Sequence, residues 1–285
     1  MSRYSTLREI ESLDPVRDHA RIYFLSTGIE FSWDTVRALE IALYRTYCVP
    51  SVSALLDKTG EFRLRAQKRY DDTSLIISDI CEYGYDSERG REAIRRMNSI
   101  HNRFQIANDD YLYVLSTFIF VPIRWMDRFG WRKMCRHEKL ATFYFWREVG
   151  RRMAIKEIPE TYEEFERFHD DYERRRFRYT DSNRAIGTAT RELFVRWLPR
   201  PFAPLVRRSI NALLDDAMIE AFGFPRPSRF MRAFMSGSLR LRGRVIRRLP
   251  PRKKPHFFSH DRNRTYPDGY RVSELGPADG VERDD

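Results

Sequence analysis

The chain has 285 residues, of which 42% are hydrophobic, 14% aromatic and 33% charged, and its formal net charge is +11. So many aromatic residues can build a large core, which excludes global disorder, a collagen-like fibre and a disulfide-stapled miniprotein. The cysteines, Cys48, Cys81 and Cys135, lie 33 and 54 residues apart. Because zinc sites and redox motifs need closer pairs, we expect three reduced thiols.

The chain shows no sign of a targeting segment. Charges run throughout its first fifteen residues, which lack the apolar stretch of a signal peptide. The longest apolar run, from Tyr111 to Ile123, has 13 residues, whereas a helix needs about 20 to cross a bilayer. We expect no transmembrane helix and a cytoplasmic location, with peripheral attachment to a membrane left open.

The first hundred residues carry a series of helical patterns. Apolar spacing predicts helices over 33–48, 52–58 and 88–104. Between the last two, Asp72 or Thr73 is expected to cap a further helix that stops at Gly84.

The middle of the chain predicts a buried helix pair. Asn108 is expected to cap an apolar helix that Pro122 interrupts. The helix over 138–155 is apolar on nearly every side between Leu140 and Trp146, which is typical of a core element, and Glu148 can pair with Arg152 one turn later. The charged stretch over 160–175 predicts a surface helix.

The remaining chain predicts a final helical pair, over 205–222 and 229–248, after a proline-containing linker at 198–201, and an irregular tail beyond Pro250. No alternating pattern requires a strand. We expect an all-α protein of roughly nine or ten helices. It should comprise a lead at 1–21, one large helical domain at 22–222, and a basic helix with its tail at 223–285.

Positive charge is concentrated in one segment. Residues 221–260 hold eleven cations and no acid, which equals the whole net charge of +11. On a helix over 229–248, Phe230, Phe234, Leu241 and Val245 form one apolar stripe, and most of the arginines lie away from it. We expect first a solvated surface and second a basic amphipathic helix on an anionic membrane. Nucleic acid is an unlikely partner because the segment lacks a base-reading signature.

Common catalytic signatures are absent: the chain has no GxSxG, GxxxxGK[ST], HExxH, GxGxxG or CxxC motif. Among six histidines, His101 stands out because it borders the apolar face of its predicted helix and can share a polar notch with Asn98. A core histidine satisfied by a neighbouring group is the favoured interpretation, and a functional histidine is the alternative. Thr117 should bond back to its own helix, and it is the hydroxyl we expect in a pocket if that helix lines one.

Long strings of the sequence resemble a known family. They occur in matching order and are ALYRTYCVPSVSALLDKTGEF (42–62), RYDDTSLI (69–76), RGREAIRRMNSIHNRFQIANDDYLYVLSTFIFVPIRW (89–125), FGWRKM (129–134), FYFWREVGRRMAIKEIP (143–159) and RTYPDGY (264–270). From about residue 22 to 270 the chain resembles the MpaB/rubber oxygenase family, and specifically its MpaB-like branch. The resemblance implies an all-helical, globin-reminiscent fold. It also implies a haem b that activates O2 to cleave a carbon–carbon double bond in an apolar, isoprenoid substrate.

The resemblance also implies site residues. Arg96 aligns with an arginine over the haem, whereas Leu115 stands where rubber oxygenases have the proximal histidine. Because leucine cannot ligate iron, His101 is the best substitute, as axial metal ligand or as distal proton donor. Arg96 would then hold a propionate.

Three further roles follow from this assignment. Asn98 and Thr117 are expected to bond bound oxygen, and Asp79 is expected to act as a base. The alternative function is a haem-free helical protein that binds lipid or docks on a membrane through 229–248.

Overall fold

The computed structural model describes residues 2–277, which form fourteen α-helices, one π-helical turn and three short 3₁₀ turns without a strand. The prediction of an all-α fold is confirmed. The helices are α1 (Ser5–Ser12), α2 (His19–Phe24), α3 (Ser32–Thr46), α4 (Pro50–Thr59), α5 (Glu61–Leu64), α6 (Ala66–Tyr83), α7 (Glu88–His101), α8 (Asn108–Phe129), α9 (Arg136–Arg152), α10 (Tyr162–Arg176), α11 (Asp181–Arg196), α12 (Ala203–Leu213), α13 (Asp216–Phe222) and α14 (Arg229–Arg248). The π-helical turn is Leu25–Glu30, and the 3₁₀ turns are Arg200–Phe202, Phe258–His260 and Val272–Glu274.

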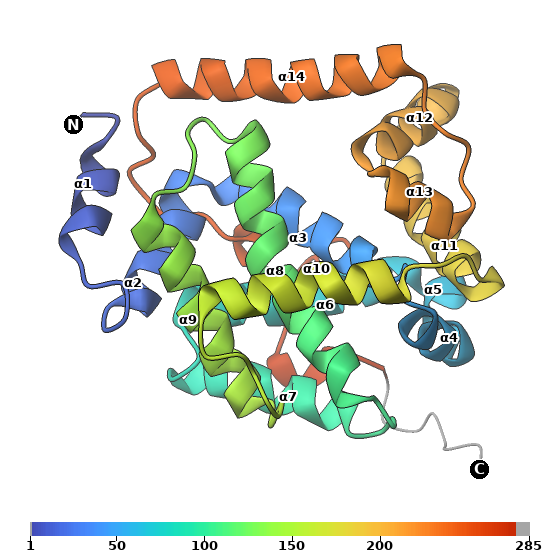
Figure 1. Ribbon diagram of the computed structural model, residues 1–285, viewed down its shortest axis with the longest axis horizontal. Helices are drawn as coiled ribbons and strands as arrows, with labels where there is room; N and C mark the ends of the chain where they lie inside the picture. Colours follow the sequence, from blue (N-terminus) through green and yellow to red (C-terminus); the bar gives the residue numbers. More distant parts are fainter. Residues whose placement is uncertain (1, 278–285) are drawn as a thin grey trace.

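The centre of the molecule is α8, which packs against α3, α9 and α10 (Figure 1). Most of its side chains are buried, and Tyr113, Ile119 and Phe120 are fully enclosed. Helix α9 supplies Phe143, Phe145 and Trp146 to the same core. The expected buried helix pair is therefore α8 and α9.

Several expected boundaries are wrong. Helix α8 continues through Pro122, because packing on all sides supports the turn that the missing N–H weakens. The cap position of α8 is Ala107, and Asn108 instead bonds the backbone of Lys156 in both directions. Helix α6 begins at Ala66, so Asp72 and Thr73 lie inside it rather than capping it.

The number of helices is also larger than the expected nine or ten. The stretch 205–222 is split where the Asp215 side chain accepts a hydrogen bond from the Met218 N–H at 2.9 Å and starts α13. Helix α11 and the short helices α1, α2 and α5 were not expected at all. Short helices that depend on neighbours for burial leave a weak periodic pattern in the sequence.

Helix α14 has the predicted bounds and lies along one edge of the molecule (Figure 1). Arg242 attaches it to α3, since its guanidinium lies 3.0 Å from the Asp34 carboxylate and 3.7 Å from the ring centre of Trp33. A Cβ atom at Gly243 would lie 2.9 Å from the Phe129 carbonyl oxygen, so only glycine permits this approach to the end of α8.

The segment 257–275, which we call the strap, crosses back over α6. Thr265 and Tyr266 bond Asp71 and Asp72, and Tyr270 donates to Asp79. Phe257, Val272 and Leu275 are buried in the main core. The strap thus covers acidic side chains that a free α6 would leave in water.

Candidate functional site

Leu115 lies at the crossing of α8 and α9 in a close-packed contact. A Cβ atom at Gly150 would be 2.5 Å from Leu115 Cδ2 and 2.9 Å from Ile158 Cδ1. The leucine side chain therefore fills the space between the two helices. Leucine itself offers no iron ligand, and its close contact with Gly150 and Ile158 leaves no room for a macrocycle, so a haem bound through this position does not fit.

His101 ends α7 and differs from Leu115 in having a donor atom. Its Nδ1 is buried without a hydrogen-bond partner among the described residues, and its ring meets Tyr111 edge-on at 5.7 Å. Burial, helped by the positive charge of Arg69, lowers the pKa of His101 from 6.5 to about 4. The imidazole is therefore neutral at pH 7, the form that can bind iron or accept a proton.

The other predicted site residues each have a partner within the fold. On α7, Asn98 Nδ2 donates to the Arg152 carbonyl at 2.9 Å and Arg96 Nε donates to the Leu275 carbonyl at 2.6 Å. On α8, the fully buried Thr117 hydroxyl donates to the Val114 carbonyl at 2.7 Å. These bonds direct the three side chains toward different neighbours.

Asp79 lies on α6 and is fully buried. Its carboxylate accepts a hydrogen bond from the Tyr270 hydroxyl at 2.7 Å and faces Arg89 Nε at 3.0 Å. Burial raises its pKa above 3.8, although Tyr270 and Arg89 oppose the change. Asp79 is thus held by the strap and by α7, while His101, Asn98 and Arg96 share α7.

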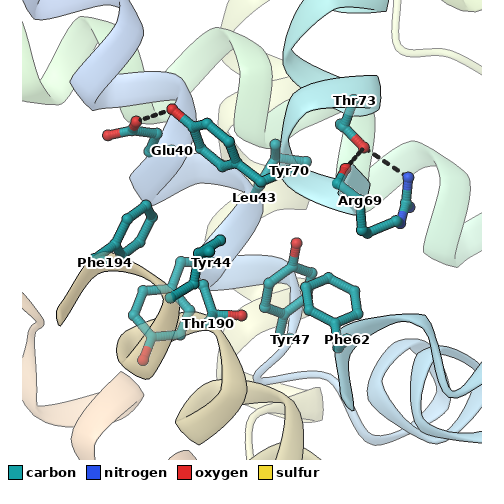
Figure 2. A pocket seen from close by; sticks show the side chains of 11 residues that line it. Glu40, Leu43, Tyr44, Tyr47, Phe62, Arg69, Tyr70, Thr73, Thr190 and Phe194 are labelled. Atoms are coloured by element: carbon teal, nitrogen blue, oxygen red, sulfur yellow. Dashed lines mark hydrogen bonds between the residues drawn. The ribbon is translucent and has the colours of Figure 1, made fainter. Parts of the chain in front are cut away.

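The two best-formed cavities lie away from these residues. The first, of about 30 Å³, is enclosed mainly by α3, α6 and α11 (Figure 2). Tyr70 donates to Glu40 at 2.5 Å across it, and Arg69 Nη1 donates to Thr73 at 2.6 Å. Burial raises the pKa of Glu40, against the effects of Arg37 and Tyr70. Arg69, which lines this cavity, is also the residue whose positive charge adds to burial in lowering the pKa of His101.

The second cavity, of about 40 Å³, lies between α3, α6 and the strap. Its walls are largely apolar and include Leu39, Ile77, Cys81 and Phe257. One water molecule needs about 10–15 Å³ of such cavity space, so each cavity has room for only a few waters, whereas ligand pockets usually exceed about 300 Å³. Neither cavity therefore accommodates a haem or a substrate until its walls move apart.

A buried polar network next to Leu115 escaped the sequence analysis. Ser116 Oγ lies 2.8 Å from His169 Nδ1, and His169 Nε2 lies 3.2 Å from Glu173 Oε1. Glu173 also pairs with Arg45 and accepts from the Tyr113 hydroxyl at 3.0 Å. The only available signal was the four-residue spacing of His169 and Glu173 on one predicted helix.

The contacts of this network run from serine to histidine to glutamate, as in a hydrolase triad, but the serine is closed off from any substrate. Ser116 and His169 are fully buried, and the Ser116 hydroxyl lies 2.6 Å from the Tyr113 carbonyl, to which it can donate. Neither cavity reaches the serine. A nucleophile needs an open side toward its substrate, so the network joins α8 to α10 and α3 as a structural element.

Residues 2–277 contain no cluster of three or more histidine, cysteine or acidic side chains that could hold a metal ion. In the same part of the chain, none of the helices combines the length and the apolar character needed to cross a bilayer.

Comparison with known proteins identifies relatives over most of the chain. The sequence model of the "ER-bound oxygenase mpaB/B'/Rubber oxygenase, catalytic domain" family matches residues 36–248. The chain is 29% identical over 241 residues to the ER-bound oxygenase mpaB' of Penicillium brevicompactum. This match covers 78% of the chain and 57% of the relative. It is 28% identical over 211 residues to the ER-bound oxygenase mpaB of Penicillium roqueforti, and this second match covers 68% of the chain and 71% of the relative.

The matched range contains His101, Leu115 and the whole of α8, α9 and α14. The chain spans little more than half the length of the first of these relatives. The family match nevertheless extends over well more than half of this chain and agrees with the strings noted in the sequence. This chain therefore belongs to the family of mpaB/B' and rubber oxygenase catalytic domains.

Proposed function

We propose that this protein is an oxygenase that uses a haem b and O2 to oxidise an apolar, isoprenoid-type substrate. Membership of the oxygenase family supports the reaction class. The observation that carries the cofactor assignment is the buried, unpartnered and neutral Nδ1 of His101. A buried polar atom without a partner is costly, and a bound metal ion would satisfy it.

In this proposal the haem supplies the iron that activates O2, and the chain holds and surrounds it. His101 would coordinate the iron, and Arg96 would hold a propionate. Asn98 and Thr117 would supply hydrogen-bond donors for O2, and each would have to give up its present carbonyl partner to do so. Asp79 accepts a proton, for which its raised pKa is suited. The surrounding helices must separate to admit the group, because the cavities are small.

The first experiment is purification after expression with a haem precursor, followed by a visible spectrum and iron analysis. We expect a Soret band with near-stoichiometric iron, and oxygen uptake that depends on an isoprenoid chain. The variant His101→Ala should lose most of the band and iron, whereas His137→Ala at the start of α9 should keep both. Thermal unfolding of both variants separates loss of the ligand from loss of the fold.

A colourless, iron-free and folded protein would overturn the proposal. So would a His101→Ala variant with an unchanged band. That outcome would favour the second candidate function, a haem-free helical protein that binds lipid. The observation that favours this candidate is the tight contact of Leu115 with Gly150. By the resemblance, Leu115 stands at the position of the proximal histidine of rubber oxygenases.

A further inference from the structure

Helix α14 has two apolar faces, and only one of them is used by the fold. Leu239 and Ile246 face inward and pack against the main core. On the outward side Phe230, Phe234, Leu241 and Val245 are 75%, 55%, 58% and 49% exposed. At ~100° per residue these four side chains fall within about 60° of arc and form one stripe. We call this stripe the outer stripe.

An apolar stripe on the solvent side is unusual. A surface helix normally turns its apolar side to the core and its charges to water. Isolated exposed apolar residues need no explanation, but an ordered row of large ones marks a contact surface. Since the inward face already supplies the packing of α14, the outer stripe is not needed to hold the helix in place.

Arginines border the outer stripe and remain available. Arg232 and Arg242 lie on the inward half, where they pair with Asp216 and Asp34. Arg240, Arg244 and Arg248 are exposed, and within residues 2–277 they form no ion pair. No acid occurs between residues 221 and 260 to compensate them. The outward half of α14 therefore combines large apolar side chains with uncompensated positive charge.

We propose that α14 lies flat on an anionic membrane surface, with the outer stripe inserted among the acyl chains and the neighbouring arginines on lipid phosphates. Phenylalanine and leucine reach the boundary between headgroups and acyl chains, and arginine side chains extend to the headgroups from that depth. Nucleic acid would use the charges and leave the outer stripe in water. The membrane accounts for both features with one orientation of the helix.

The attachment of α14 to the body transmits this orientation. Arg242 fixes the helix to Asp34 and Trp33 on α3, and Gly243 lies against the end of α8. Because α14 forms one edge of the molecule (Figure 1), docking sets the body on the membrane through that edge, with α12 and α8 packed against the helix. This inference does not depend on haem, so its test is independent of the proposed oxygenase activity.

The test is co-sedimentation of the full chain with phosphatidylcholine vesicles that contain or lack phosphatidylserine. We expect binding to the anionic vesicles that weakens with added salt. The variant Phe230→Ser/Phe234→Ser/Leu241→Ser should bind at least ~10-fold more weakly. The variant Arg240→Gln/Arg244→Gln/Arg248→Gln should lose about 100-fold, at roughly fivefold per arginine near the surface.

Matched controls change the same residue types elsewhere. Leu64→Ser removes another strongly exposed leucine, and Arg91→Gln/Arg95→Gln removes exposed arginines of α7. Both should bind as the unaltered chain does, and circular dichroism checks that every variant is folded. Lack of binding to anionic vesicles would overturn the proposal, as would full binding by the stripe variant. A lipid-free dimer that the stripe variant abolishes would assign the outer stripe to a second copy of the chain instead.

Discussion

Glu173 shows how a single half-buried acid can join three helices. It receives Arg45 from α3, Tyr113 from α8 and the contact of His169 on its own helix. Burial alone would raise the pKa of Glu173, but Arg45 and His169 hold it well below 4.5. The ionised carboxylate is therefore part of the folded structure.

Replacing this acid should be costly. Glu173→Gln leaves the half-buried Arg45 guanidinium with only Asp215 as a charged partner, and we expect a loss of ~3 kcal/mol in the free energy of unfolding. Urea denaturation at neutral pH measures the loss. Glu163→Gln, on the exposed side of the same helix, should change stability by less than ~0.5 kcal/mol.

The same carboxylate predicts a pH dependence. Its folded pKa is depressed, so its contribution is complete above pH 4.5 and is lost as the pH falls below that value. The difference in stability between the unaltered chain and Glu173→Gln should therefore narrow on acidification. A difference that stays constant down to the acid transition would show that Glu173 is not selectively stabilised in its ionised form.

Gly150 provides a second prediction for single residues. Gly150→Ala places a methyl group against Leu115 and Ile158, and overpacking of this kind costs ~1–3 kcal/mol. In a Leu115→Ala background the same change should cost much less, because the clashing side chain has been removed. A double-mutant cycle measures this coupling. Gly237→Ala, where no atom lies within 4 Å of the new Cβ, should instead be neutral or stabilising.

At the scale of the helix, α14 and α11 show what the sequence does and does not reveal. The bounds of α14 follow from local signals, since Ser228 caps its start and Pro250 follows its end. Helix α11 is hard to find because its buried Asn183, Gly187 and Thr190 interrupt the apolar period. A Cβ atom at Gly187 would lie 2.6 Å from Phe222, so a distant contact gives that glycine its place.

In the candidate site, too, local sequence signals predict some features, whereas features that depend on distant contacts were missed. Sequence spacing predicts that His101 borders the core, and the resemblance implies that Leu115 stands where rubber oxygenases have their proximal histidine. The cavity at Glu40 and Arg69 was not predictable, because it depends on how α3, α6 and α11 cross. Periodicity assigns a residue to a face of its own helix and contains no information about which other helix meets that face.

Helix α14 offers a prediction for an element as a whole. Arg242→Ala removes the contacts with Asp34 and Trp33, and we expect a loss of about 2 kcal/mol because the buried Asp34 keeps only part of its compensation. Amide hydrogen exchange should accelerate along 229–248. Arg244→Ala, on the exposed side, should leave the exchange unchanged. Equal exchange in the two variants would contradict the anchoring role of Arg242.

At the scale of the molecule, the strap connects distant parts of the chain through Phe257. This ring is buried beside Phe24. It lies so close to Gly28 that a Cβ atom there would be 2.6 Å from the ring. The neighbouring His256 N–H donates to the Gly28 carbonyl at 2.9 Å. Phe257→Ala should cost ~3 kcal/mol and accelerate exchange in the strap and in the π-helical turn. Phe230→Ala, at an exposed position, should leave thermal stability unaltered. Equal stability of the two variants would show that Phe257 does not hold the strap.

The position of the strap also has a consequence for biosynthesis. Thr265 is made 194 residues after its partner Asp71 on α6. At 5–20 residues per second, roughly 10–40 seconds separate the two on the ribosome. During that interval α6 has left the exit tunnel with Asp71, Asp72 and Asp79 unpaired by the strap, and carboxylates so exposed favour water over a closed core. Lys68 and Arg89 can pair with Asp72 and Asp79 earlier, but the hydrogen bonds from Thr265, Tyr266 and Tyr270 form only after the strap has been translated.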